Sequence, residues 1–476
     1  VAVGTPPRFP KINDMRSQTF KMWRLAMTGL LTSACAPLSP SHPSQQAPIV
    51  FVHGNGDSAA LWQTTLWRFE SNGWSHHLLH TLDVAYPLAR DADDKPQAGR
   101  SSTKEHMQAL RAKVEAVLQE TGSKRVILIG NSRGAYAIRN YICNGGGSQW
   151  VSHAILGGGP NHGVQAIPGL NDANEFSGAG PFLKQLNAPK NANGDEVCGP
   201  TQWMTIRSDN NDKFAQPDGL WLGMKGRPTF VGFEGPELKG ALNVVIPKID
   251  HRETSFSPAA FAASFQFITG KAPEHNILAQ EHIELNGKVF GLGVDPLKAD
   301  SGNFVNNLPL RGAKLKVYAI DTQTGQRQGH AEHAVTVQED GHWGPFKANS
   351  HTAYEFELTM EGYATTHIYR SPFARSSNII HMRPERLAAA DRTTQAMVIW
   401  TRPRGYFDAS RDHMLLNGKT DIPGVIKGVS AGNSSAKIRI DEFPQREVSA
   451  EFNSEKIKAL TWPASQGHVT VLELTY

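Results

Sequence analysis

Residues 125–142, RVILIGNSRGAYAIRNYI, constrain the fold of this chain more than any other stretch. Residues 126–129 are a continuous apolar run, which is typical of a strand buried on both faces of a sheet. The turn Gly-Asn-Ser-Arg-Gly follows at 130–134, and apolar residues then recur at helical spacing. A Gly-x-Ser-x-Gly turn between a strand and a helix holds its serine in a strained conformation that exposes the hydroxyl. The segment therefore predicts strand, sharp turn and helix, with Ser132 as a candidate nucleophile.

Strand-like and helix-like segments alternate on both sides of this turn. The expected strands are residues 49–52, 77–82, 126–129, 151–156, 203–206 and 242–246, and the clearest expected helices are 104–120 and 258–269. Such alternation favours a mostly parallel sheet with helices on both faces. We therefore expect an α/β domain over residues 48–272. Its loop at 160–200, rich in Gly, Asn and Pro, is long enough to form a cap.

The pattern of the sequence changes after residue 272. Apolar and polar side chains alternate at 313–319 and again at 354–358, as they do in half-buried strands. No long amphipathic helix is predicted in this part of the chain. We expect an all-β region of one or two sandwiches or barrels, divided into a β-sandwich domain at 276–385 and a second β domain at 386–476.

Three residues of the α/β domain have the order that nucleophilic catalysis by serine requires. A serine hydroxyl needs a histidine to accept its proton and a carboxylate to orient that histidine. In a sheet of this kind the acid follows the serine along the chain, the histidine follows the acid, and each lies after a strand. Asp212 and His251 follow two of the expected strands in this order. Ser132, Asp212 and His251 are therefore the predicted catalytic triad.

The choice of acid has an alternative, because Asp209 follows the same expected strand as Asp212. We favour Asp212, since a polar-to-apolar run ending in proline follows it, and interpret Asp209 as a turn former. His251 is the only histidine of the α/β domain downstream of the acid. His53 and His162 lie in loops expected to border the site, where they would shape those loops through side-chain hydrogen bonds.

Two backbone amides are needed to stabilise a tetrahedral oxyanion. We expect one from Arg133, directly after the nucleophile, and one from the loop His-Gly-Asn-Gly at 53–56, most simply from Asn55. No cofactor is predicted, since the sequence has neither a P-loop nor a dinucleotide fingerprint. No metal is predicted either, because the cluster His330, Glu332 and His333 lacks a distant pair of ligands.

The first 35 residues have the features of an export signal. Basic residues precede an apolar stretch at 25–34 that is too short to span a bilayer. Thr-Ser-Ala-Cys at 32–35 resembles a bacterial lipobox, so Cys35 is either lipidated or close to an ordinary cleavage site. We expect a linker at 36–47 and a periplasmic, outer-membrane-anchored or extracellular protein.

Charge and cysteine content agree with export. Residues 1–34 hold five basic residues and one acidic residue, so their net charge is +4. The net charge of the whole chain is also +4. The remainder is close to neutral and gives no support to nucleic-acid binding. Cys143 and Cys198 are then either a disulfide formed in an oxidising compartment or two unpaired buried thiols.

The motifs over residues 47–270 resemble those of bacterial α/β hydrolases of the lipase and esterase kind. The segments that carry this resemblance are HGNG at 53–56, GNSRG at 130–134, GGPNHG at 158–163 and GALNVVIPKIDH at 240–251. The overall plan, a hydrolase domain followed by β structure, is similar to that of two-domain archaeal lipases. In those lipases the second domain is implicated in handling long acyl chains.

This resemblance and the predicted triad together imply an exported serine ester hydrolase that acts on apolar acyl esters. A polyester depolymerase or an amidase with the same triad is an alternative, because substrate choice depends on the shape of the cap. A further alternative is a surface lipoprotein that binds a polymer and has a degenerate hydrolase domain. In either case the C-terminal β region would contact a lipid or polymer surface.

Overall fold

The computed structural model describes residues 46–209, 211–293, 304–426, 432–441 and 447–476. The predicted signal segment 1–35, with Cys35, and nearly all of the expected linker lie outside the described residues. Within the described part of the chain, no helix combines the length and the apolar character needed to cross a membrane.

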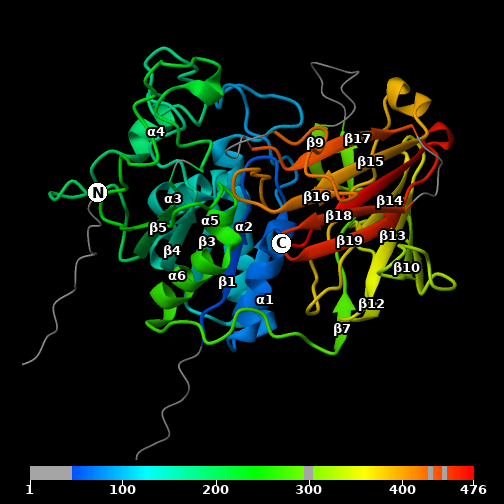
Figure 1. Ribbon diagram of the computed structural model, residues 1–476. Helices are drawn as coiled ribbons and strands as arrows, with labels where there is room; N and C mark the ends of the chain where they lie inside the picture. The colour runs from blue at the N-terminus through cyan, green and yellow to red at the C-terminus, as the bar shows by residue number, and fades with distance from the viewer. Residues whose placement is uncertain (1–45, 210, 294–303, 427–431, 442–446) are drawn as a thin grey trace, which may run out of the picture. The chain divides into compact units, whose positions relative to one another are not determined.

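The α/β part of the chain is built on a six-stranded sheet in which all neighbouring strands are parallel. Its strands are β1 (Ile49–Val52), β2 (Leu79–Leu82), β3 (Val126–Asn131), β4 (Val151–Gly157), β5 (Gln202–Arg207) and β6 (Leu242–Val245). Their order in space is β2-β1-β3-β4-β5-β6, so β3 lies near the centre (Figure 1). Because the strands all run the same way, the loops after β3, β5 and β6 lie at one edge of the sheet.

Helices cover both faces of this sheet, as the alternating pattern predicted (Figure 1). They are α1 (Gln63–Ser71), α2 (Thr103–Thr121), α3 (Arg133–Asn144), α4 (Pro181–Leu186), α5 (Glu253–Phe256) and α6 (Pro258–Thr269). Alternate side chains of β1 belong to two cores: Ile49 and Phe51 pack with α1 and α6, whereas Val50 and Val52 pack with α2 and α3. The continuous apolar run of each central strand is thus explained by burial on both faces.

Capping interactions mark the starts of the two longer helices α2 and α6, and a glycine marks the end of α2. Ser102 and Glu105 form a capping box at the start of α2, and Gly122 ends that helix with φ 63°. The Ser257 side chain accepts a hydrogen bond from the Ala260 amide at the start of α6.

In the described part of the C-terminal region, the regular secondary structure consists of β-strands and two short 3-10 helices. Its strands are β7 (His282–Leu285), β8 (Phe290–Gly293), β9 (Phe304–Pro309), β10 (Lys314–Ile320), β11 (His333–Thr336), β12 (Phe346–Asn349), β13 (Ala353–Thr359), β14 (Thr365–Arg370), β15 (Ala396–Thr401), β16 (Met414–Leu416), β17 (Ser435–Ile440), β18 (Glu447–Phe452), β19 (Glu455–Leu460) and β20 (His468–Glu473). The α/β-hydrolase fold with an all-β C-terminal region is therefore confirmed.

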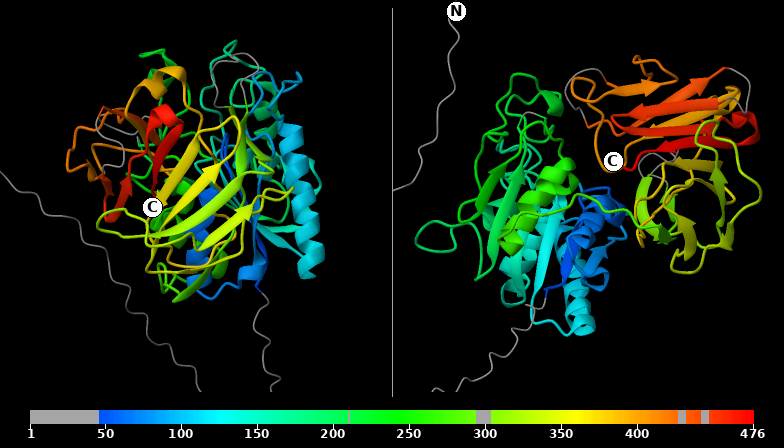
Figure 2. Two further views of the ribbon diagram at one scale, coloured as in Figure 1. Left: turned by 90° about the vertical axis from the view of Figure 1, so that its right-hand side faces the viewer. Right: turned by 60° about the horizontal axis from the view of Figure 1, so that its bottom comes forward.

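One seven-stranded sheet, in the order β11-β10-β13-β14-β20-β15-β17, dominates this region, and Figure 2 shows its earlier and later strands side by side. Its strands come from both of the expected β domains, 276–385 and 386–476. The division of the region into two separate domains therefore stays a prediction. The alternation in β10 is as expected, with Leu315 and Val317 buried and Lys314 and Lys316 exposed. One face of the sheet packs in a core with β7 and β12, and the other packs against the sheet β16-β18-β19.

Residues Gln46–Tyr476 form one compact unit, and buried contacts join its α/β and β parts. Trp67 of α1 packs in a core of the β region, and its indole N–H donates to the Ser376 carbonyl at 2.9 Å. The His381 ring lies 3.1 Å from the Asp83 carboxylate, which follows β2. The β region is therefore in direct contact with the sheet that carries the candidate site.

Candidate active site

Ser132 occupies a strained turn between β3 and α3, with φ 52° and ψ −118°. A side chain seldom adopts this positive φ, and the turn persists because close packing surrounds it. A Cβ atom added at Gly134 would lie 2.4 Å from the Val52 carbonyl oxygen, and one at Gly130 would lie 2.9 Å from the Gly134 backbone. Both glycines are thus required for α3 to start so close to the sheet.

His251 and Asp212 are paired at the same edge of the sheet. The Nδ1 atom of His251 lies 2.9 Å from Oδ2 of Asp212, and both side chains are buried. Because a carboxylate oxygen accepts hydrogen bonds, Nδ1 is the donor in this pair, and Nε2 is the ring nitrogen that can accept a proton. Among the described residues, no group makes a hydrogen bond to this buried Nε2 atom. The pair therefore has the geometry of a general base held by an acid.

Asn131 links the serine turn to the histidine loop. Its side-chain amide donates to the His251 carbonyl at 3.2 Å and to the Ser255 hydroxyl at 2.8 Å. Since Asn131 directly precedes Ser132, these bonds fix the two candidate catalytic side chains relative to each other. The sequence analysis did not single out this residue.

Asp209, the alternative acid, has other partners. Its two carboxylate oxygens accept hydrogen bonds from the backbone amides of Asn211 and Lys248, at 3.1 and 3.0 Å. It thereby joins the loop after β5 to the loop after β6. This is the turn-forming role that the sequence suggested for Asp209.

Ser132 and His251 line one cavity of about 250 Å³. Gly54 and Asn55 form part of its polar side. Its apolar wall consists of Val164, Phe176, Phe214, Trp221 and Tyr406. The Phe214 ring also contacts the His251 ring edge-on, with centroids 4.5 Å apart. A mostly apolar cavity with a nucleophile at one side suits a substrate with an apolar chain.

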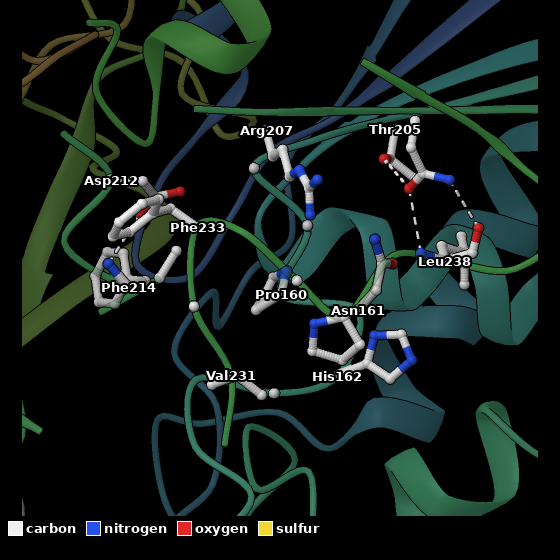
Figure 3. Close-up of a pocket in the computed structure, with 18 of the residues that line it drawn as sticks. Pro160, Asn161, His162, Thr205, Arg207, Asp212, Phe214, Val231, Phe233 and Leu238 are labelled. Atoms are coloured by element: carbon white, nitrogen blue, oxygen red, sulfur yellow. Dashed lines mark hydrogen bonds between the residues drawn. The ribbon is translucent and has the colours of Figure 1, made fainter. Parts of the chain in front are cut away.

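The residues that line a second, smaller cavity of about 70 Å³ include Asp212 and His251, and Figure 3 shows the side chains of its wall. Asn161 and His162 of the cap segment and Arg207 at the end of β5 point toward it. The His162 ring is fixed by Glu196, 3.1 Å from its Nε2 atom. This cavity is more polar than the one that Ser132 lines, so the Asp212–His251 pair borders two cavities of different character.

The expected oxyanion amides lie beside Ser132. A Cβ atom at Gly54 would lie 3.0 Å from Cβ of Ser132, so the loop that carries Asn55 passes directly over the serine turn. The Asn55 side chain is held by the Ala89 amide at 2.7 Å. Arg133 is the first residue of α3, where the backbone N–H has no acceptor within the helix.

The Arg133 side chain is fully buried and bound to the cap segment. Its guanidinium donates to both oxygens of Glu175, at 2.7 and 2.8 Å, and also to the carbonyl of Ser101. Burial raises the pKa of Glu175, and the positive charge of Arg133 opposes that shift. Because Phe176 follows Glu175 and lines the cavity, this ion pair connects the serine turn to the cavity wall.

His53 shapes its loop, as the sequence suggested. Its Nε2 atom accepts from the Val84 amide at 3.1 Å, so Nδ1 carries the proton and donates to the Gly54 carbonyl at 2.9 Å. Burial lowers the pKa of this ring, although nearby Asp83 opposes the shift. His53 is therefore a neutral residue that shapes the 53–56 loop, to which it belongs.

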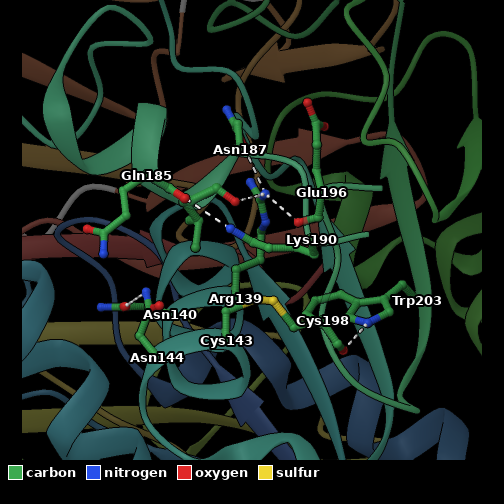
Figure 4. The surroundings of a disulfide bond; sticks show 11 residues. Arg139, Asn140, Cys143, Asn144, Gln185, Asn187, Lys190, Glu196, Cys198 and Trp203 are labelled. Carbon is green, nitrogen blue, oxygen red and sulfur yellow. Dashed lines mark hydrogen bonds between the residues drawn. A yellow bond between two sulfur atoms is a disulfide. The ribbon is translucent and has the colours of Figure 1, made fainter. Parts of the chain in front are cut away.

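Cys143 and Cys198 form a disulfide, with an S–S distance of 2.06 Å (Figure 4). It joins the last turn of α3 to the end of the expected cap segment at 160–200. Arg139, one turn earlier on α3, donates to the Asn187 side chain at 2.8 Å and to the Glu196 carbonyl at 3.3 Å. The disulfide and these bonds hold the cap segment against the helix that follows Ser132.

In the described ranges, one group of three side chains has the spacing of metal ligands, namely Glu355, Glu357 and His367. The Arg327 guanidinium lies among them, 2.7 Å from each of the two glutamates. A guanidinium in that position already neutralises the carboxylates, so these residues do not fit a resident metal. His333, from the cluster considered above, instead bonds to the Trp343 carbonyl.

Several cavity residues were missed by the sequence analysis. Arg252 directly follows the predicted catalytic histidine, and this position in the sequence could have indicated that it lies near the site. Trp221 and Phe176 lie in long loops without periodicity. Tyr406 is in the β region, 155 residues after His251, and no local pattern connects it to the site.

A parallel sheet covered by helices on both faces, with a strained serine turn after its central strand, defines the α/β-hydrolase fold. Residues 46–201 match the family model for class 2 lipases, and residues 281–387 match the model for the lipase C-terminal domain. The chain thus carries a segment that matches a class 2 lipase domain, followed by a segment that matches a lipase C-terminal domain, and these matches identify it as a carboxylic ester hydrolase.

Solved structures similar to this chain include several lipases. The Bacillus licheniformis lipase BlEst2 in its propeptide form is 16% identical over 88% of this chain and 97% of that chain, with a TM-score of 0.35. Phospholipase PlaB from Legionella pneumophila is 11% identical over 72% of this chain and 94% of that chain, with a TM-score of 0.33. Lipase B of Aspergillus fumigatus is 13% identical over 49% of this chain, with a TM-score of 0.34, and only 55% of that lipase is covered.

Proposed function

We propose that this protein hydrolyses apolar acyl esters through a triad of Ser132, His251 and Asp212. The observation that carries the proposal is the buried His251 ring in the cavity that Ser132 also lines, held at Nδ1 by Asp212 and with no hydrogen-bond partner for Nε2 among the described residues. A histidine in this arrangement can take a proton from a serine hydroxyl.

The reaction has two stages. In the first, Ser132 Oγ attacks the ester carbonyl while Nε2 of His251 takes its proton, and the amides of Arg133 and Asn55 stabilise the negative oxygen. The tetrahedral intermediate collapses, the alcohol leaves with the proton from His251, and an acyl-enzyme remains. In the second, Nε2 of His251 takes a proton from a water molecule as the water attacks the acyl carbonyl; the bond to Ser132 Oγ then breaks, His251 returns the proton to Oγ, and the carboxylic acid leaves. Asp212 stabilises the imidazolium in both stages.

The apolar wall of the cavity supports an apolar acyl group as the part of the substrate that binds beside Ser132. Phe176, Phe214 and Trp221 can bury a hydrocarbon chain, which gains about 0.8 kcal/mol for each buried methylene group. This argument applies equally to glycerides and to aliphatic polyesters. A lipid or polymer contact of the C-terminal β region belongs to the same proposal.

The first test is hydrolysis of p-nitrophenyl esters from acetate to palmitate by the wild type and by Ser132→Ala. We expect the variant to lose about 10⁴-fold or more in kcat, because the nucleophile is removed. If the activity of the wild type rises with acyl chain length, the result would support a lipase. If the activity is confined to short esters, the result would indicate small or polymeric esters as the substrate. Ester hydrolysis that survives in Ser132→Ala would contradict the mechanism.

The second test separates the two acids. Asp212→Asn should lose about 10⁴-fold in kcat, because the amide no longer holds His251 in the required tautomer. Asp209→Asn is the matched control and should retain activity close to that of the wild type. If the two variants behave the other way round, the acid assignment is reversed.

We also propose that the protein is exported. The disulfide supports this, because disulfides persist in oxidising compartments. Cleavage and lipidation at Cys35 concern residues outside the described ranges and stay predictions. The mass of the mature N-terminal peptide from a bacterial expression host would distinguish a free N-terminus from a lipidated cysteine. An uncleaved N-terminus would contradict processing at this site.

A further inference from the structure

The loop at 402–412, between β15 and β16, binds the loop that carries His251. Asp250, next to His251, is fully buried and uses its two carboxylate oxygens in different directions. Oδ1 accepts from the backbone amides of Arg252 and Glu253, at 2.8 and 2.9 Å, and so fixes the turn around His251. Oδ2 accepts from the Arg402 guanidinium at 2.9 Å and from the Tyr406 amide at 2.7 Å.

Glu253, two residues after His251, makes a second set of contacts with the same loop. Its Oε1 atom lies 2.6 Å from Nη2 of Arg402, and its Oε2 atom lies 2.6 Å from Nη1 of Arg411. Arg411 also donates to the Lys248 carbonyl at 2.9 Å. The histidine loop is therefore bound before and after His251 by two arginines of the β region.

The 402–412 loop contacts the acid loop as well. Asn211 directly precedes Asp212 in the chain, and its side-chain amide donates to the Asp408 carboxylate at 2.9 Å. Tyr406 completes the arrangement, because its ring lines the cavity with Ser132 and His251. A single loop of the β region thus touches both segments that hold the catalytic pair.

Burial makes these contacts strong determinants of position. The Arg402 side chain is 4% exposed, so its interactions are poorly screened by solvent. Loss of Arg402 would leave the buried Asp250 carboxylate with the Tyr406 amide as its one close partner on Oδ2, apart from Arg411 at 4.0 Å. A buried carboxylate that loses a charged donor is expected to move toward other donors or water. Because His251 follows Asp250 directly in the chain, such a movement would also displace His251.

We propose that the 402–412 loop is part of the catalytic machinery, with Arg402 as a positioning residue that holds His251 through Asp250 and Glu253. This inference rests on the proposed function of the triad. It assigns to the C-terminal β region a role in the chemical step that is separate from any contact with the acyl chain. The competing interpretation is that the arginines only attach the β region to the α/β domain.

The test compares Arg402→Gln with the wild type in the full-length protein. If Arg402 positions His251, kcat should fall at least about 10-fold while KM changes less than about 2-fold, because misalignment affects the reacting groups and not the acyl cavity. The rate of inactivation by a fluorophosphonate, which reacts with the activated serine, should fall by a similar factor. Arg402→Lys should recover part of both rates, since a lysine can still reach one carboxylate.

Arg327→Gln is the matched control. Arg327 also bridges two carboxylates in the β region, Glu355 and Glu357, and none of its interactions with the described residues involves the 402–412 loop. Its loss should lower stability and leave kcat and the inactivation rate unchanged. If Arg402→Gln does not fold, Arg411→Gln takes its place, because Arg411 is more exposed and makes one of the two contacts with Glu253.

The outcomes separate this inference from the proposed function. A folded Arg402→Gln or Arg411→Gln variant with wild-type kcat and inactivation rate would overturn the positioning role while leaving the triad intact. An equal loss of kcat in Arg327→Gln would also overturn it, because the effect would then be general destabilisation. If the wild type shows no hydrolysis that depends on Ser132, the proposed function itself fails.

Discussion

At the scale of the residue, Gly134 lies against the backbone of the neighbouring strand, and that contact fixes the serine turn. In Gly134→Ala the new Cβ would lie 2.4 Å from the Val52 carbonyl and 2.8 Å from that of His53. Neither carbonyl can move without shifting β1, so we expect about 1–3 kcal/mol of destabilisation and a clear loss of kcat. Urea unfolding and ester hydrolysis measure the two effects.

Gly122→Ala is the control for this substitution. Gly122 has φ 63°, but no atom lies within 4 Å of its missing Cβ, so the variant carries only the conformational cost. We expect it to lose about 1 kcal/mol and to keep its kcat. A Gly134→Ala variant with normal activity would show that the turn tolerates the displacement.

At the scale of the element, the Cys143–Cys198 disulfide holds the cap segment to α3. It closes a loop with a sequence separation of 55 residues. Loop-closure entropy predicts about 4 kcal/mol of stabilisation for such a loop, which the variant Cys143→Ala/Cys198→Ala should lose. Urea unfolding with and without dithiothreitol measures this loss. The reductant should lower the midpoint of the wild type and leave that of the double variant unchanged.

The prediction has an independent chemical check. Alkylation of the unfolded protein without reductant should modify neither Cys143 nor Cys198, and alkylation after reduction should modify both. Labelling of both cysteines before reduction would show that the bond is absent from the purified protein.

At the scale of the whole molecule, the Asp83–His381 pair joins the α/β domain to the β region. Burial alone would raise the pKa of Asp83, but His381 and the Ala59 amide lower it below its ordinary value of 3.8. The charged form therefore stabilises the folded state above that value, and this contribution is lost as the pH falls below it.

Asp83→Asn should lower the free energy of unfolding by about 3 kcal/mol at pH 6, because the variant leaves His381 without its buried partner. The difference from the wild type should shrink as the pH is lowered from 4 toward 2, which urea unfolding at a series of pH values measures. Asp340→Asn is the control, since its pair with His342 is exposed and should contribute little. A difference that is constant over this pH range would contradict the role of the Asp83 charge.

The sequence was most informative where structure is set by neighbours along the chain. Apolar runs and the Gly-x-Ser-x-Gly turn predicted the six strands and the position of Ser132. It was least informative in long loops. Phe176 and Trp221 line the cavity from segments without periodicity, and the partners of Glu175 and Asn131 are far away in sequence.

The sequence alone therefore determined the α/β-hydrolase fold, the all-β texture of the C-terminal region and the order of the candidate catalytic residues. These depend on periodicity and on local backbone conformation, which a chain encodes over a few residues. Only the tertiary structure decided that Asp212 and not Asp209 faces His251, and that Tyr406 and Arg402 lie at the site. Such contacts depend on how segments far apart in the sequence pack together, and a buried charge is stable only where packing brings a partner within reach.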